Sequence, residues 1–475
     1  MSSQIKKPSF GFALFSLLFI ICFITAGIAF FKLQLHLLML TGWVICALIG
    51  MRLGYTFTDL EKGAYELIQK AMGACLILIC VGALIGAWIS SGTVPIMIYA
   101  GLKIISPGIF LVTSLIVCSL TSIFTGTSWG TIGTVGVALM GIGAGLGFEP
   151  GLTAATIICG AFFGDKMSPL SDTTNMAAAV CGTPLFRHIR HMWFTITPAY
   201  IITLIIYFVM GFYHEGNEMS PEQINVILNG LSSNFNLGFG AILPILLVLI
   251  MLLKRCTPII SITSGALCGV VVAVLFNNMD LTPAFNSMWV GFKGDFSDTP
   301  ILAKLLNRGG VTSMLNIMCL VVLACGLGGM LRHMGIIEVA LEPLARWANS
   351  GFKLVVSTLI VGYGTLMLTA AIYFSIVMTG TLMAPVFRRH GLKPENCSRV
   401  VEDASTLGGP LVPWANNALF PMATLGVAYL EYIPYVYLLV LTPCFSILYA
   451  LFNITMTKID PNEEAEQEAQ NVQNA

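Results

Sequence analysis

Twelve residues, 164–175, concentrate the chemistry of this chain. They read Gly-Asp-Lys-Met-Ser-Pro-Leu-Ser-Asp-Thr-Thr-Asn and follow directly on an uninterrupted apolar run. An unpaired carboxylate at the centre of a bilayer costs about 2.5–3.5 kcal/mol, so charge at that depth indicates a function. Asp165 and Asp172 are therefore candidate functional residues, provided that this segment lies at membrane depth. The alternative is a cytoplasmic loop whose aspartates cap helices.

Oxygen atoms dominate this stretch, and they favour small alkali cations. A helix broken inside a bilayer leaves carbonyls and amides unpaired, which is tolerable only where they line a cavity or bind a ligand. A carboxylate also takes a proton, so one site can exchange Na⁺ for H⁺ by competition. Lys166 would tune the charge of Asp165, although adjacent residues on a helix point apart.

Three other polar interruptions accompany this one. Residues 125–131 read Thr-Gly-Thr-Ser-Trp-Gly-Thr and lie in the same half of the chain. The second half has a break containing threonine and glycine at 369–381 and a break bearing carboxylates at 402–417. The elements that carry these breaks must bring them together if they form one site.

Composition shows that those elements are membrane spans. Of 475 residues, 56% are hydrophobic and only 10% are charged, whereas soluble domains are about 25% charged. The formal net charge is zero, which argues against nucleic acid as a partner. The apolar run after Lys6 and Lys7 lacks a small-residue cleavage site and is expected to be an uncleaved first span. The 13 cysteines show no metal-ligand spacing, so we expect core thiols.

About 20 mostly apolar residues are needed to cross a bilayer as a helix. An amphipathic interface helix is expected at 58–70, and 277–308 is expected to be a polar loop. The long apolar segments, expected as spans, are 10–31, 35–51, 71–89, 107–123, 193–212, 239–253, 259–276, 313–331, 355–374 and 432–452. Shorter or interrupted apolar runs occur at 94–105, 132–147, 151–163, 335–347, 376–386 and 418–429. The fold class is therefore all-α and polytopic, with about 10–12 transmembrane segments that include broken or re-entrant helices.

Charge sets the expected orientation. Arg187 and Arg190 precede a span whose far end leads to a loop with Glu215, Glu218 and Glu222. Because basic residues favour the cytoplasmic side, the arginines and the N-terminus are placed inside and the acidic loop outside. Beside these arginines, His188 and His191 are interpreted as interfacial anchors rather than a metal or proton site.

The two halves are similar in pattern. Gly92 to Gly108 spans the same sixteen positions as Gly335 to Gly351, and each half continues with its two breaks. The charge rule starts the first half inside and the second half outside, as in inverted-topology repeats. The predicted organisation is a first repeat at 1–213, an external linker at 214–236, a second repeat at 237–457 and an acidic, disordered tail at 458–475.

At these motifs the sequence resembles the NhaC family of Na⁺/H⁺ antiporters. The residues that carry the resemblance are 122–138, 164–175, 182–198 and, in the second half, Glu402-Asp403 followed by Pro410-Leu-Val-Pro-Trp414. The resemblance implies a secondary transporter, not an enzyme, in the cytoplasmic (inner) membrane of a bacterium. It implies Na⁺ and H⁺ as transported ions, no cofactor, and the lipid bilayer as its surroundings, and it leaves a homodimer open.

On that resemblance, Asp165 and Asp172 are the expected cation and proton carboxylates, and the expected Na⁺ ligands. The predicted neutral donors or helix caps are Ser168, Ser171, Thr173 and Asn175. Thr127 and Ser128 would contribute from the facing break, and Asp403 and Asn416 from the second half. Each serine or threonine has an equal alternative, a hydrogen bond back to its own helix.

The sequence suggests other functions as well. Some members of the family resemble exchangers of malate and lactate or of amino acids, so the cargo could be a small carboxylate or amino acid coupled to Na⁺ or H⁺. An intramembrane aspartyl protease is suggested by Gly164-Asp165, but the partner aspartate in a Tyr-Asp context is missing. The glycines of 141–147 lack the spacing and the βαβ context of a dinucleotide site. Paired breaks with titratable groups suit alternating access better than a passive channel.

Overall fold

The computed structural model describes residues 6–214, 221–296 and 300–459, and over this part of the chain it is all-helical. The only β-type pairing there is an isolated bridge between Leu392 and Lys458. Eight described helices are long and apolar enough to cross a membrane, or ten when each of two bent pairs is counted as one span. The all-α, polytopic fold class is confirmed. From residue 460 on, the predicted acidic tail lies outside the described residues, as do residues 215–220 of the predicted linker.

In the first half, the described residues form ten α-helices and one π-helical segment. In chain order they are α1 (Phe10–Ala29), α2 (Leu35–Leu53), α3 (Phe57–Ser90), α4 (Thr93–Ile104), α5 (Pro107–Thr125), α6 (Ser128–Thr131), the π segment (Ile132–Gly136), α7 (Val137–Gly145), α8 (Pro150–Met167), α9 (Asp172–Cys181) and α10 (Leu185–His214).

The second half begins with helices that connect the two halves, and several of its later helices are short and separated by breaks. They are α11 (Pro221–Asn234), α12 (Leu243–Leu253), α13 (Pro258–Phe276), α14 (Leu281–Val290), α15 (Pro300–Leu306), α16 (Leu315–His333), α17 (Ile336–Trp347), α18 (Gly351–Thr369), α19 (Ile372–Arg389), α20 (Pro394–Ser405), α21 (Asn416–Leu425), α22 (Tyr429–Tyr432) and α23 (Tyr437–Leu451).

Helix α3 differs from the sequence prediction. The expected interface helix at 58–70 and the span at 71–89 form a single helix of 34 residues. Thr56 and Asp59 build a capping box at its start, and no residue within it forces a break. Amphipathic and apolar sequence therefore continue through one helix, because an exposed polar stripe does not end the hydrogen-bond ladder.

The predicted polar loop at 277–308 also contains helices, α14 and α15, and α14 packs against α3. The backbone N–H of Gly310 donates to the carbonyl of Gly82 on α3, at 2.8 Å. A Cβ at Gly86 would come within 1.9 Å of the Ser287 carbonyl oxygen. Close approach of the backbones thus requires glycine on this face of α3.

The helices after α3 and after α16 recur in the same order. Helices α4 and α17 have 12 residues each, α5 and α18 have 19, and α9 and α21 have 10. Gly126 and Ala370, 244 residues apart, end α5 and α18 in the left-handed conformation, with φ of 70° and 56°. The same separation relates Gly182 and Gly426, which end α9 and α21.

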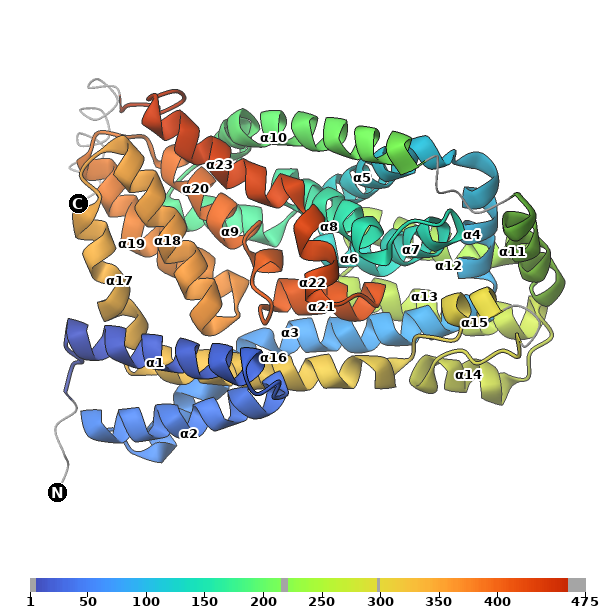
Figure 1. The fold of residues 1–475 in the computed structure, drawn as a ribbon, viewed down its shortest axis with the longest axis horizontal. Helices are drawn as coiled ribbons and strands as arrows, with labels where there is room; N and C mark the ends of the chain where they lie inside the picture. The colour runs from blue at the N-terminus through green and yellow to red at the C-terminus, as the bar shows by residue number, and fades with distance from the viewer. Residues whose placement is uncertain (1–5, 215–220, 297–299, 460–475) are drawn as a thin grey trace.

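Helices α3 and α16 pack side by side and run in opposite directions through the molecule (Figure 1). This arrangement supports the predicted repeat, and its inversion across the membrane stays a prediction. Most of the apolar core divides into two clusters, one around α3, α5 and α8 and one around α2, α16 and α19. The breaks lie between these clusters.

Candidate cation and proton site

A cavity of about 680 Å³ lies where the breaks of the two halves meet. Six of the predicted site residues line it: Thr127, Ser128, Asp165, Asp172, Thr173 and Asn416. Its wall also includes residues 371–374 of the second half and the exposed basic residues Lys70 and Arg255. The structure therefore brings together side chains that lie up to 289 positions apart in the chain.

The first break positions Ser128. Gly126 turns the chain with φ of 70°, and a Cβ there would lie 2.7 Å from the Cβ of Leu170. Both the conformation and the close approach require glycine. Thr127 then caps α6, because its hydroxyl accepts a hydrogen bond from the N–H of Gly130 at 3.2 Å. The cap leaves Ser128 buried at the start of the helix, directed at α8.

Asp165, 6% exposed, is held between two breaks. The Ser128 hydroxyl donates to its Oδ2 and the Ser171 hydroxyl to its Oδ1, each at 2.6 Å. The Thr173 hydroxyl lies 2.9 Å from that of Ser171. Because both donors are hydroxyls, they stabilise the carboxylate without neutralising its charge, and its remaining lone pairs can bind a cation or a proton.

Asp172 lies at the start of α9 and is more exposed than Asp165. Its Oδ1 accepts a hydrogen bond from the N–H of Thr173 at 3.0 Å, and its Oδ2 accepts one from the hydroxyl of Tyr373 at 2.5 Å. Tyr373 belongs to the second half and follows the left-handed residue Ala370. Asp172 thus joins the two halves across the cavity wall.

A second contact between the halves involves the start of α21. The indole N–H of Trp129 donates to Oδ1 of Asn417 at 3.2 Å. The Trp129 ring stacks on Phe420, with centroids 4.2 Å apart and an interplanar angle of 9°. The neighbouring Asn416 also lines the cavity, and its N–H donates to the carbonyl of Ala370 at 3.1 Å.

Two predicted site residues shape the break instead of lining the cavity. The Ser168 hydroxyl donates to the carbonyl of Ile123 at 2.7 Å and accepts from the N–H of Leu170 at 3.2 Å. The Asn175 amide donates to the carbonyls of Pro169 and Ser171, at 2.9 and 2.6 Å. Ser171 is also absent from the cavity lining, but it contacts the cavity residue Asp165 directly.

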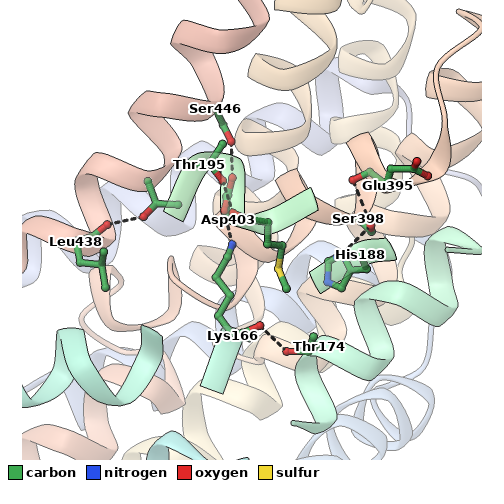
Figure 2. A network of polar contacts seen from close by, with 11 residues as sticks. Lys166, Thr174, His188, Thr195, Glu395, Ser398, Asp403, Leu438 and Ser446 are labelled. Carbon is green, nitrogen blue, oxygen red and sulfur yellow. Dashed lines mark hydrogen bonds and ion pairs between the residues drawn. The ribbon is translucent and has the colours of Figure 1, made fainter. Parts of the chain in front are cut away.

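Asp403 and Lys166 form a buried ion pair away from the cavity (Figure 2). Both side chains are fully buried, the Lys166 ammonium donates to Oδ1 of Asp403, and the Ser446 hydroxyl donates to Oδ2. The hydroxyl of Thr174 holds the end of α8 by donating to the carbonyl of Lys166 at 3.0 Å. The structure thus separates Asp403 from the other carboxylates that the sequence predicted.

No group of three or more histidine, cysteine, aspartate or glutamate side chains suited to a metal ion occurs among the described residues. The cavity offers single carboxylates with hydroxyl and amide oxygens, a donor set that suits a monovalent cation better than a transition metal. The sequence analysis missed Tyr373, Trp129 and Asn417 as contact residues. All three lie within breaks that the sequence does show.

The sequence matches a family model and several known proteins. Residues 160–454 match the sequence model of the Na⁺/H⁺ antiporter family. The chain is 35% identical to the Na⁺/H⁺ antiporter NhaC of Alkalihalophilus pseudofirmus over 95% of its length and 98% of the relative.

The names of two relatives describe the transport of organic molecules. The chain is 37% identical to a malate-2H⁺/Na⁺-lactate antiporter of Bacillus subtilis, over 86% of this chain and 87% of that protein. It is 30% identical to the arginine/ornithine antiporter ArcD of Halobacterium salinarum, over 98% of this chain and 96% of that protein. This chain, a multi-pass membrane transporter and not an enzyme, belongs to the Na⁺/H⁺ antiporter family.

Proposed function

We propose that the protein exchanges Na⁺ or Li⁺ for protons across the cytoplasmic membrane of a bacterium, with its N-terminus inside. Asp165 is the carboxylate that binds the cation. The observation that carries this proposal is the position of Asp165, which is buried at a cavity wall with one hydroxyl donor from each of two helix breaks. Among the described residues the side chain of Asp165 bonds to neutral hydroxyls and not to a basic group, so a transported ion completes the site.

Cation binding would use the oxygens already gathered there. The carboxylate of Asp165 supplies the charge, and Ser128, Thr127 and Asn416 supply neutral oxygens from both halves. Asp172 adds a second negative charge within the same cavity. Broken helices near the midplane form such sites because their unpaired carbonyls and ends replace the water shell of an ion.

Alternating access is part of this proposal, and the residues that line the cavity suggest which side is open here. The exposed residues Lys70 and Arg255 line its outer part, and basic residues favour the cytoplasmic side. Trp129, stacked on the fully buried Phe420, also lines the cavity. We therefore assign this conformation as inward-open and propose a second conformation in which the roles of the two halves are exchanged.

A second candidate function is exchange of a small organic acid or amino acid coupled to Na⁺ or H⁺. The cavity volume of about 680 Å³ favours it, because one water occupies about 30 Å³ and a single cation needs little more. Lys70 and Arg255 could bind a carboxylate. The names of two relatives also describe organic cargo.

One experiment separates these functions. The purified protein is reconstituted in vesicles that contain a pH dye, and Na⁺, Li⁺, K⁺, malate, lactate and several amino acids are added separately. Proton flux with Na⁺ or Li⁺ alone supports the cation/proton antiporter. Flux that requires an organic acid or amino acid contradicts it and assigns the organic cargo, with the carboxylates serving the coupling ion.

A further inference from the structure

Glu402 is a buried carboxyl that the cation cavity does not use. It lies on α20 with 0% exposure. The Thr406 hydroxyl is its neighbour one turn on, yet neither oxygen of Glu402 accepts a hydrogen bond of normal geometry from any described residue. A carboxylate so placed would carry an unsatisfied charge in a medium of low dielectric constant, which is strongly unfavourable. Its neutral, protonated form is not penalised in this way.

The charges around Glu402 belong to one cluster. Glu402 interacts electrostatically with Lys166, Asp165 and Asp403. Lys166 is bound to Asp403 (Figure 2). Arg399 also interacts with Asp403, and its Nη1 donates to the hydroxyl of Thr455 at 3.0 Å.

The cluster is short of at least one positive charge. Lys166 and Arg399 supply two cations, whereas Asp165, Asp403 and Glu402 supply three carboxyls, and the buried Glu395 adds a fourth near the start of α20. In a desolvated interior an excess charge is costly, so one carboxyl must be protonated or one monovalent cation must bind. A proton or a Na⁺ ion each adds one positive charge to the cluster. When one of them is bound, binding of the other is less favourable.

Hydrogen bonding decides which carboxyl takes which ion. Asp165 accepts hydrogen bonds from Ser128 and Ser171, and such donors favour the ionised form. Glu402 accepts none of normal geometry, and its neighbouring donor is the single hydroxyl of Thr406. We propose that Glu402 is the proton-binding carboxyl of the exchanger, separate from the cation-binding Asp165. This inference rests on the proposed cation/proton exchange and names the residue that carries its proton.

Helix α8 couples the two carboxyls. Asp165 and Lys166 are consecutive, so their side chains point about 100° apart, one toward the cavity and one toward Asp403. When Na⁺ binds Asp165, added positive charge beside Glu402 favours breaking the O–H bond of its carboxyl. The proton passes to water, and the glutamate charge is balanced by the bound cation. By linkage, a proton on Glu402 weakens cation binding by the same factor.

Further polar side chains lie along α20 between Glu402 and the start of this helix. Ser398 and Glu395 lie four and seven positions before it, on the same helix face. The Ser398 hydroxyl is 2.8 Å from Nδ1 of His188 on α10, and Figure 2 shows this group beside the ion pair. The titratable or charged side chains around the cluster come from α8, α10, α18, α20 and α23: Asp165, Lys166, His188, His191, Tyr363, Glu395, Arg399, Asp403 and Tyr449.

The test measures proton release in weakly buffered detergent solution when Na⁺ is added, together with ²²Na⁺ binding. The native protein releases protons as Na⁺ binds. Glu402→Gln is expected to bind ²²Na⁺ but to release at least about tenfold less proton. Glu338→Gln is the matched control, because Glu338 also has a buried, unpartnered oxygen but lies on α17. It should behave as the native protein.

Glu402→Asp keeps a titratable group and provides a test that does not depend on the folding of the glutamine variant. It should retain release with a shifted pH midpoint. Native release by Glu402→Gln, or an unshifted midpoint in Glu402→Asp, overturns the assignment of the proton to Glu402. Absence of Na⁺- or Li⁺-driven release in the native protein instead overturns the proposed function.

Discussion

Tyr373 donates a 2.5 Å hydrogen bond to Asp172 from the opposite half of the chain. Trp129 lies 244 residues before Tyr373, and it donates a hydrogen bond to Asn417 at the start of α21 in the other half. In each half, an aromatic donor lies in the break after the 19-residue helix (α5 or α18). It bonds to the first turn of the ten-residue helix of the other half (α21 or α9). These two contacts join the halves at the cavity, and they would have to change if the halves move relative to each other.

Asp165→Asn is expected to abolish exchange while membrane insertion persists. Loss of the charged ligand from a desolvated site costs about 3–5 kcal/mol, which corresponds to about a hundredfold or more in cation affinity. Cation-driven proton flux in vesicles is the measurement. Asp280→Asn, at an exposed position before α14, is the control, and full exchange by Asp165→Asn would refute the assignment.

Asp172→Asn should have a smaller effect. Asp172 is exposed, where a charge interaction contributes about 1 kcal/mol or less, and an asparagine oxygen can still accept the hydrogen bond from Tyr373. We expect the apparent Na⁺ affinity to fall by about fivefold or less. A loss as large as that of Asp165→Asn would show that both carboxylates bind the ion.

Ser128→Ala and Ser171→Ala each remove a hydroxyl donor from Asp165. A hydrogen bond to a charged group contributes about 1.5–3 kcal/mol, so the proton should compete better and the apparent Na⁺ affinity should fall about tenfold. The concentration dependence of flux measures this. Ser114→Ala on α5 is the control, because its buried hydroxyl has no partner among the described residues; an equal change there would indicate a general packing effect.

Lys166→Met and Asp403→Leu should each destabilise the protein by about 3–5 kcal/mol, because each removes one partner of a buried ion pair. The double variant should recover most of this stability, since neither charge remains. Thermal unfolding of the purified variants tests the cycle. Additive losses in the double variant would contradict a direct pairing.

Tyr373→Phe should lower stability by about 1–2 kcal/mol, because only its hydroxyl reaches Asp172 and that carboxylate is exposed. Exchange should persist. The change in unfolding midpoint is compared with that of Tyr65→Phe, whose side chain is 56% exposed on α3. Equal midpoints for the two variants would mean that the contact between the halves adds nothing.

Residue types and short-range spacing predicted much of the site. The polarity of Asp165 within an apolar run marked it as functional, and Ser171 and Ser128 proved to be its donors. The pairing of Lys166 with Asp403 was not predictable, because it joins residues 237 positions apart and depends on how α8 and α20 pack. Tyr373 was missed for the same reason, although its break was recognised. Helix α3 shows an error of the opposite kind. Polar residues suggested that one helix ends and another begins near residue 70, but the backbone continues through this point as one helix.

The pairing of Lys166 with Asp403 also constrains how the protein is made. Asp403 is synthesised 237 residues after Lys166, which takes about 10–50 s at an elongation rate of about 5–20 residues per second. Helix α8 is not among the eight described helices that are long and apolar enough to insert alone. Lys166 therefore lacks its partner Asp403 during synthesis of these 237 residues, about half of the chain, and we expect α8 to reach its final depth only once the second half has emerged. The last steps of assembly, not the first insertions, create the ion site.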